Sequence, residues 1–477
     1  MADAKETIVI IGGGVIGCCT AYYLTRHPSY DPTRHSITLI EATRLASGAS
    51  GKAGGLLAQW AYPASLVPLS FDLHRELAAD HDGATAWGYR PIRCGKLTAH
   101  DRSLPNPADA RGDDKPAGGL AAWAVRQLNA WNPLGKQREV QKVEKYLAPV
   151  ENLPEDLDWF RKECVTKYED IAPAAASETA QVNPYQFTNA MARLAEERGV
   201  KILVNSPVEE LIYDDDDDDN DDNSMGSGAT PHGGAGRIRR VKAVSYVDKA
   251  TAQAVTIPAT TIILAAGPWT PVLFPMLPMS AIRAHSVTIR PRRPLAAYCL
   301  FTELTVPHNP DPSPDERRDP DPARQQQQRP RQTNGNHHAR PAAGTRLISP
   351  EVYTRPNNEV YIAGEGDSRA PLPATTDEVE VDRAACQTLV DALSSISDEL
   401  RDAVVTGRRA CYLPTVDLPS GGPLVGPSWV AGLLLATGHS CWGIHNAPAT
   451  GKLVAEMVFD GRALSADIDA LDPQLAV

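Results

Sequence analysis

The chain has 477 residues, of which 42% are hydrophobic and 22% are charged, and this is the composition of an ordinary globular protein. Its length indicates roughly two or three domain-sized units with room for a large core. The formal net charge of -12 argues against binding of nucleic acid or an anionic membrane surface, and no apolar stretch reaches the roughly 20 residues of a membrane span.

The first forty residues alternate apolar runs with a glycine-rich turn. Residues 8–11 predict a strand, residues 15–26 a helix and residues 36–40 a second strand. Gly12, Gly14 and Gly17 stand between the first strand and the helix in GxGxxG spacing. In this spacing the first glycine allows a tight turn, the second lets the backbone approach a pyrophosphate, and the third lets the helix pack closely on the sheet. The start of the helix offers amide donors to phosphates.

Glu41 closes the second predicted strand, 24 residues after Gly17. A carboxylate at this place accepts hydrogen bonds from the ribose hydroxyls of a dinucleotide. Because strand, turn, helix, strand and acid fall in register, they disfavour a glycine-rich turn that binds nothing. NAD and FAD share this fingerprint. The small residues at 46–55 suit a loop along the rest of a flavin dinucleotide, and the alternative is a flexible linker.

Further elements follow in chain order. Four apolar residues, Phe187, Met191, Leu194 and Ala195, recur at helical spacing before Gly199. Residues 201–204 and 260–265 predict strands. Strands that alternate with helices predict a parallel sheet covered on both faces. Residues 211–213 and 238–256 predict an antiparallel ribbon.

Two segments are predicted to be disordered insertions. Residues 214–236 hold an aspartate tract followed by a Ser/Gly-rich stretch. Residues 307–343 hold eight prolines and four consecutive glutamines. Neither composition buries enough apolar surface to offset the entropy of ordering the chain.

The eight cysteines form no CxxC pair and no Cys/His cluster with zinc spacing, so we expect no metal site. The apolar run at 8–11 is too short for a signal peptide. We therefore expect a soluble, cytoplasmic protein with reduced thiols and no integral membrane contact. Nothing in the sequence supports a peripheral association with endosomes.

Taken in order, the motifs resemble the D-amino-acid oxidase (DAO) superfamily of FAD-dependent oxidoreductases, which includes glycine oxidase, sarcosine oxidase and D-amino-acid dehydrogenase. The resemblance is greatest to fungal oxidoreductases of unknown substrate. The matching segments are Glu41 and residues 12–17, 47–55, 182–200, 262–270, 421–427 and 437–461.

The resemblance implies an α/β fold, in which a Rossmann-like FAD-binding domain with a parallel sheet is joined to a substrate domain with a mixed or antiparallel sheet. The FAD-binding domain would be discontinuous, at roughly 1–90, 180–270 and 405–477. The substrate domain would comprise roughly 91–179 and 271–404.

The resemblance also implies the residues that bind the cofactor. Val208 would clasp the adenine through its backbone, and the chain at Ala266 would pass beside the pyrophosphate. A helix that starts near Ile444 would aim its positive end at the flavin edge where negative charge develops on reduction. The full set is Gly12, Gly14, Val15, Ile16, Gly17, Glu41, Ala42, Ser47, Ser50, Gly51, Lys52, Gly54, Gly55, Leu56, Val208, Ala266, Gly267, Gly438, His439, Gly443 and Ile444.

The substrate side departs from the family pattern. In glycine-oxidase-like members an arginine before a proline clamps the substrate carboxylate, whereas this chain has Leu413 before Pro414. Leucine makes no bidentate carboxylate pair, which puts simple amino-acid oxidation in doubt. The candidate catalytic residues are His445, where sarcosine-oxidase-like members carry a lysine, and Tyr353, where a pocket tyrosine is found. The alternatives are a helix residue bonded to backbone for His445 and a packed strand residue for Tyr353.

Two cysteines fall near the expected flavin. Cys411 aligns with the position where sarcosine oxidase links covalently to its flavin, and Cys441 lies in the expected flavin loop. A covalent link needs an exposed, activated thiolate. We interpret both residues as small buried apolar side chains and expect FAD to be bound non-covalently.

We therefore expect an FAD-dependent oxidoreductase that takes a hydride equivalent from a carbon bonded to nitrogen, in an amine or amino-acid-like small molecule, to flavin N5. Two alternatives stay open. One is an FAD-fold protein that acts mainly through partners in trafficking or regulation, which Leu413 favours and the intact Gly12, Gly14, Gly17 and Glu41 disfavour. The other is a flavin dehydrogenase with an electron acceptor other than dioxygen.

Overall fold

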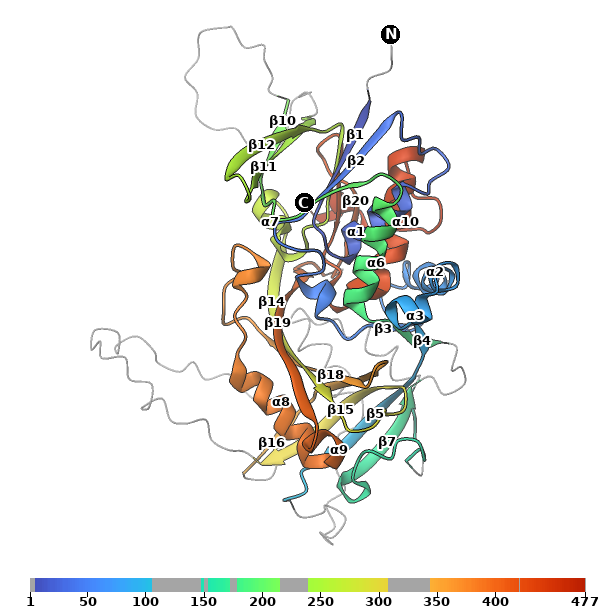
Figure 1. Ribbon diagram of the computed structural model, residues 1–477, viewed down its shortest axis with the longest axis vertical. Helices are drawn as coiled ribbons and strands as arrows, with labels where there is room; N and C mark the ends of the chain where they lie inside the picture. The colour runs from blue at the N-terminus through green and yellow to red at the C-terminus, as the bar shows by residue number, and fades with distance from the viewer. Residues whose placement is uncertain are drawn as a thin grey trace, which may run out of the picture.

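A computed structural model describes residues 5–104, 147–149, 153–171, 178–214, 239–307, 344–419 and 421–476. The two predicted insertions, 214–236 and 307–343, fall almost wholly outside these residues, as does the expectation of disorder there. The described chain forms an upper and a lower region in Figure 1, and the strands β14 (Met279–Arg290) and β19 (Val404–Val416) run between them.

The upper region is built on a six-stranded sheet in which five strands are parallel and β20 is an antiparallel edge. Strand alternation places Ile8 and Ile10 in the core on one face and Val9 and Ile11 in the core on the other. Because both faces of the sheet are covered, the apolar run at residues 8–11 is continuous. The order is β20 (Leu424–Pro427), β21 (Leu433–Thr437), β13 (Thr261–Leu264), β1 (Glu6–Ile11), β2 (His35–Ile40) and β9 (Lys201–Leu203).

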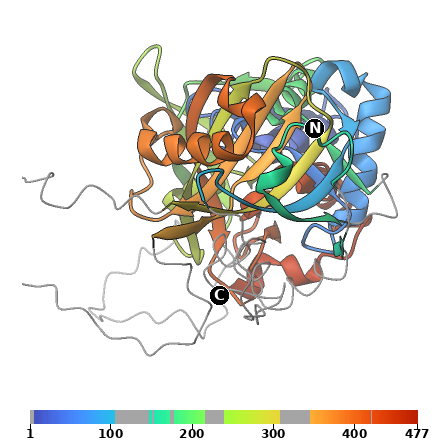
Figure 2. The ribbon, with the colours of Figure 1, turned by 90° about the horizontal axis from the view of Figure 1, so that it is seen from below.

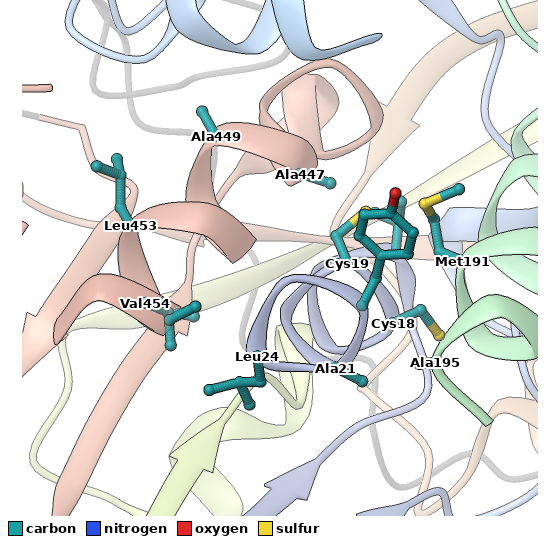
Figure 3. Close-up of a cluster of buried hydrophobic side chains, with 14 of the residues drawn as sticks. Cys18, Cys19, Ala21, Leu24, Met191, Ala195, Ala447, Ala449, Leu453 and Val454 are labelled. Carbon is teal, nitrogen blue, oxygen red and sulfur yellow. The ribbon is translucent and has the colours of Figure 1, made fainter. Parts of the chain in front are cut away.

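Three helices cover one face of this sheet: α1 (Val15–Leu24), α6 (Pro184–Glu196) and α10 (Gly443–Asp460). Figure 3 shows the small side chains of α1 lying between those of α6 and α10. A Cβ built at Gly451 of α10 would lie 2.7 Å from the carbonyl carbon of Cys19, so α1 and α10 pack backbone to backbone. Cys18 and Cys19 are buried packing residues, as expected.

The other face is covered by a three-stranded antiparallel sheet of β10 (Val208–Tyr213), β11 (Val241–Asp248) and β12 (Gln253–Pro258). The predicted antiparallel pairing of residues 211–213 with the following tract is confirmed. This face of the six-stranded sheet is covered by strands rather than by helices, because the tract is rich in β-branched residues, which favour strands.

The lower region is a nine-stranded sheet in which β5 and β15 pair in parallel and the other pairs are antiparallel. The helices α8 (Arg383–Ile396) and α9 (Asp398–Arg401) pack against one face (Figures 1 and 2). The order is β19, β14, β18 (Glu359–Asp367), β17 (Glu351–Arg355), β15 (Tyr298–Pro307), β5 (Arg93–His100), β7 (Val165–Ile171) and β6 (Leu147–Pro149), with β16 (Thr345–Ile348) beside β15.

Smaller elements join the two regions. They are α2 (Val67–Asp80), α3 (Gly83–Trp87), α7 (Thr270–Leu273) and the three-stranded sheet of β3 (Leu56–Ala58), β8 (Thr179–Gln181) and β4 (Arg90–Pro91). No helix in the described ranges is long and apolar enough to cross a membrane.

The parallel sheet with a second, mixed sheet is the α/β architecture expected from the sequence. One strand departs from the expected division. β19 starts at Val404, where the FAD-binding part was expected to resume, yet it pairs along its length with β14 in the large sheet. The division of the chain into two domains otherwise stays a prediction.

Candidate functional site

A long cavity lies at the carboxyl ends of the parallel strands and encloses about 1340 Å³, part of it open to solvent. Its walls come from the turn after β1, the loop after β2, the start of β10, the turn after β13 and the start of α10. Most of the expected cofactor residues line it: Gly12, Gly14, Val15, Ile16, Glu41, Ala42, Ser47, Ser50, Val208, Ala266, Gly267, Gly438, His439, Gly443 and Ile444. We refer to it as the FAD cavity.

The three glycines of the turn have different surroundings. Gly12 has φ +115°, and a Cβ there would lie 2.3 Å from the carbonyl oxygen of Ala265. A Cβ at Gly17 would lie 2.0 Å from the oxygen of Gly12. Around Gly14, by contrast, the nearest atom is Ser50 Oγ at 3.1 Å. The protein's own packing needs the outer two glycines, whereas Gly14 leaves open a space in the cavity that suits a pyrophosphate.

Glu41 is fixed at the wall of the FAD cavity. Its Oε2 accepts a hydrogen bond from the Gly13 amide at 2.8 Å, and its Oε1 accepts one from the Thr43 amide at 2.9 Å. Burial raises the pKa of this carboxyl group, and the two amide hydrogen bonds oppose the rise. The carboxylate is thus held in one orientation beside the glycine turn, where an acceptor for ribose hydroxyls is needed.

The loop at 46–55 is anchored on both sides, so it is not a free linker. Ser50 Oγ accepts a hydrogen bond from the Val15 amide at 2.9 Å. Ser47 Oγ bonds with Thr43 Oγ1 at 2.9 Å and with Thr376 Oγ1 at 2.8 Å. Thr376 lines the FAD cavity from the segment before α8. Sequence reasoning missed it because that segment carries no motif.

The start of α10 reaches the FAD cavity at Gly443 and Ile444, and α2 braces it. Pro448 has no N–H for the carbonyl of Ile444. That carbonyl lies 2.9 Å from His74 Nε2, and Ser70 Oγ donates to the carbonyl of His445 at 2.5 Å. Burial lowers the pKa of His74 to about 4, so the ring is neutral and Nε2 carries the proton.

A second cavity of about 740 Å³ adjoins the FAD cavity. The two share Ala49, Ala53, Leu413, Cys441 and Ile444 in their walls. Four expected cofactor residues line this second cavity instead of the first, and Gly17 and Gly51 line neither. The four are Lys52, Gly54, Gly55 and Leu56.

The large sheet holds the loop between the two cavities. Lys52 Nζ donates to the carbonyl of Ala410 at 2.9 Å, and the Tyr361 hydroxyl donates to the carbonyl of Lys52 at 2.8 Å. Arg355 donates to the carbonyls of Ala53 and, at 3.1 Å, Gly54. The loop is therefore fixed in place by three strands of the lower region.

Tyr353 lines the second cavity and is also packed in the core, and its contact with substrate stays a prediction. A Cβ at Gly54 would lie 2.5 Å from its ring, so the ring packs directly on the loop. Its hydroxyl donates to Glu351 Oε2 at 2.6 Å. Glu351 also lines the cavity, and burial raises the pKa of its carboxyl group. Sequence reasoning missed Glu351, although it stands two residues before Tyr353 on the same strand.

His445 lies within α10 but belongs to the walls of neither cavity. Its ring is fully buried, with centroids 5.9 Å from Trp442, 6.3 Å from His74 and 6.4 Å from Phe71. Neither ring nitrogen has a hydrogen-bond partner among the described residues. Burial holds its pKa well below the usual range. A contact of His445 with substrate stays a prediction, and its position does not favour one.

The two cysteines near the flavin site differ. Cys411 is buried as expected, and desolvation raises its pKa to about 11, so it is a neutral thiol rather than an activated thiolate. This fits a non-covalently bound cofactor. Cys441 is exposed, and the expectation that it is buried is wrong. It lines both cavities because it precedes the first turn of α10.

Comparison with known proteins agrees with this geometry. A family model described as FAD-dependent oxidoreductase (DAO) matches residues 7–457. TDA3 of Saccharomyces cerevisiae (strain ATCC 204508 / S288c), which is named as an oxidoreductase, is 34% identical over 545 residues. The match covers 99% of this chain and 95% of that protein. A Schizosaccharomyces pombe (strain 972 / ATCC 24843) protein, also named as an oxidoreductase, is 30% identical over 473 residues. The match covers 98% of both chains.

Solved structures show the same fold at lower identity. Glycine oxidase from Bacillus cereus ATCC 14579 superposes with a TM-score of 0.62 at 15% identity, covering 99% of both chains. L-proline dehydrogenase from P. horikoshii superposes with a TM-score of 0.60 at 14% identity, covering 98% of this chain and 97% of that one. The glycine turn, the fixed Glu41 and the open start of α10 fit a flavin dinucleotide. The chain belongs to the DAO family of FAD-dependent oxidoreductases, and its cofactor is FAD.

Proposed function

We propose that the chain oxidises a carbon–nitrogen bond of an amine or amino-acid-like small molecule. The observation that carries the proposal is the junction of the two cavities, where Leu413, Cys441 and Ile444 face both spaces. A substrate in the second cavity would lie against the end of a cofactor in the first. Similar structures are named glycine oxidase, L-proline dehydrogenase and iminodiacetate oxidase, and each name refers to a compound with a carbon–nitrogen bond.

FAD supplies the acceptor for a hydride equivalent when it is bound. The chain's own residues orient the substrate and keep water out. Leu413 and Ala363 give the second cavity apolar surface, and the loop at Lys52, which also lines it, is held by hydrogen bonds to two strands of the large sheet. Tyr353 and Glu351 provide polar atoms that face the substrate. We assign Tyr353, rather than His445, as the residue that contacts substrate.

Anaerobic titration of the purified flavoprotein with a panel of amines and amino acids tests this function. We expect a yellow protein that releases FAD on denaturation and whose flavin is bleached by a subset of amines. Glycine, sarcosine and D-alanine should leave the flavin oxidised, because Leu413 stands where a carboxylate clamp would be required. Failure of every amine and amino acid to bleach the flavin would contradict the proposal.

Leu413→Arg tests the position itself. Leu413 is 6% exposed and lines both cavities, so an arginine there would place a guanidinium group at the junction. We expect small carboxylates to perturb the flavin spectrum of this variant and not that of the unmutated protein. Leu413→Met is the control, since it keeps size and apolarity. Equal carboxylate binding in all three proteins would show that the side chain does not reach the ligand.

A further inference from the structure

We propose that the second cavity selects a cation, in which an N-alkylated ammonium group lies between aromatic rings and the Glu351 carboxylate. The inference rests on the proposed function, because it names the substrate class of the same cavity. It starts from three facts: a carboxylate without a counter-ion in the described ranges, a wall of aromatic rings, and a lysine whose charged form burial disfavours.

The carboxylate is placed by strand register. Glu351 on β17 pairs with Phe301 on β15 and with Ala363 on β18, and all three line the cavity from one face of the sheet. Glu351 takes part in no ion pair within the described ranges. Lys96 stands on β5 beyond Phe301, and its ammonium group is 3.5 Å from Glu303. The Tyr353 hydroxyl that donates to Glu351 Oε2 is neutral, so the ionised form of this carboxyl group has no compensating cation in the described ranges and would gain one when a cation binds.

The aromatic wall lies beside this charge. Phe301 and Trp442 line the cavity, and Trp60 packs edge-to-face on both, with ring centroids 6.0 Å and 5.7 Å away. Tyr62 packs on the same tryptophan at 5.9 Å. Aromatic faces attract ammonium groups, most strongly when the cation is desolvated, and alkylated ammonium ions lose less hydration than primary ones. A ring wall next to an uncompensated carboxylate is therefore a site for an alkylated cation.

Lys52, the lysine in the wall of the second cavity, does not reverse the preference for a cationic ligand. Lys52 lines the cavity, but its Nζ donates to the carbonyl of Ala410, and burial lowers the pKa of its ammonium group. No arginine is among the described residues that line the cavity. A substrate carboxylate would find no bidentate partner and would meet Glu351, so an anion is rejected.

Three probes of one shape separate charge from size. They are choline, its neutral carbon isostere 3,3-dimethylbutan-1-ol, and the anion 3,3-dimethylbutanoate. Isothermal titration of the oxidised holoenzyme measures their affinities without turnover. We expect choline to bind at least about tenfold more tightly than the neutral isostere, which corresponds to about 1.4 kcal/mol. The anion should bind most weakly.

Two variants assign the preference to residues. Glu351→Gln keeps an acceptor for the Tyr353 hydroxyl but removes the charge, and choline should then bind within about threefold of the neutral isostere. Trp442→Leu should lower the affinity for choline more than the affinity for the neutral isostere. Glu163→Gln, at an exposed carboxylate outside the walls of both cavities, controls for net charge and should keep the full preference. Flavin content and thermal midpoint check that each variant is folded, and Trp442→Leu carries the test if Glu351→Gln does not fold.

Tighter binding of the anion than of choline, or an unchanged choline preference in folded Glu351→Gln, would overturn the inference. Its failure is distinguishable from that of the proposed function. Cation preference without flavin reduction by any amine would leave the inference standing and remove the oxidase function. Flavin reduction by amines without a cation preference would do the reverse.

Discussion

The two adjoining cavities are built in different ways. The FAD cavity is lined largely by small residues at the ends of parallel strands, and its central feature, the turn at Gly12–Gly17, lies within one short segment. The second cavity is assembled from side chains far apart in the chain, such as Lys52, Phe301, Glu351 and Trp442. Cofactor binding is thus a property of local backbone geometry, whereas substrate selection depends on strand register in the large sheet.

The largest effect should come from filling the space at Gly14. In Gly14→Val the new Cβ meets only Ser50 Oγ, at 3.1 Å, and φ is -77°, which valine adopts without strain. The protein should fold, while the side chain occupies the place of the pyrophosphate. We expect flavin affinity to fall by at least about tenfold, or about 1.4 kcal/mol, measured as bound flavin per mole of folded protein.

Gly17→Val is the matched contrast. A Cβ there would lie 2.0 Å from the Gly12 carbonyl oxygen, so this variant should lose its fold together with its flavin. Full flavin occupancy in Gly14→Val would show that the pyrophosphate binds elsewhere.

The next effect compares two buried histidines behind the cavities. His74 Nε2 bonds the carbonyl of Ile444, which Pro448 leaves without a helical donor, so His74→Leu should cost about 1–3 kcal/mol of stability. His445 has two buried nitrogens without described partners, so His445→Leu should leave stability unchanged or raise it. Thermal midpoints of the two holoproteins measure the difference. A larger loss of stability in His445→Leu than in His74→Leu, together with loss of ligand binding, would show that His445 contacts the substrate.

The contrast between the cavities also explains what the sequence could reveal. The glycine turn, Glu41 and the strand at β13 were predictable because each function is encoded within a few residues. Glu351 and Thr376 were not, because their roles arise only when β17 and the segment before α8 are brought against the 46–55 loop. His445 was assigned by its place in a motif, yet helical geometry turns its side chain away from both cavities.

A smaller effect concerns pH. Burial raises the pKa of Glu351 above its ordinary value of 4.5. Choline carries a charge that does not titrate, so its affinity should fall as pH is lowered through that raised pKa, while the neutral isostere shows no change. Tyr353 has a raised pKa and does not titrate on the acid side, whereas His285 lines the same cavity and burial lowers its pKa, so a pH effect that persists in Glu351→Gln belongs to His285. A choline affinity independent of pH down to 4.5 would contradict the role of Glu351.

The smallest effect is expected from shortening the two insertions. Tyr213 pairs with Val241 and Pro307 pairs with Thr345, so each insertion joins neighbouring antiparallel strands that a short turn can connect. Replacing residues 215–238 and 308–343 with short Gly/Ser turns should leave flavin content unchanged. Each halving of the loop length changes the free energy of loop closure by only about 0.6 kcal/mol. Loss of flavin or aggregation after either deletion would show that the segment packs on the folded protein.

The most direct test of selection in the second cavity compares two substrates that differ by one carboxylate. N-methylbenzylamine and N-methylphenylglycine present the same ring and the same alkylated ammonium group, and only the second carries a carboxylate on the reacting carbon. Anaerobic stopped-flow absorbance follows flavin reduction by each at equal, subsaturating concentration. We expect the amine to reduce the flavin at least about tenfold faster, because the carboxylate meets Glu351 and no arginine. Faster reduction by the amino acid, or rapid bleaching by sarcosine or D-alanine, would contradict this account and restore a plain amino-acid oxidase.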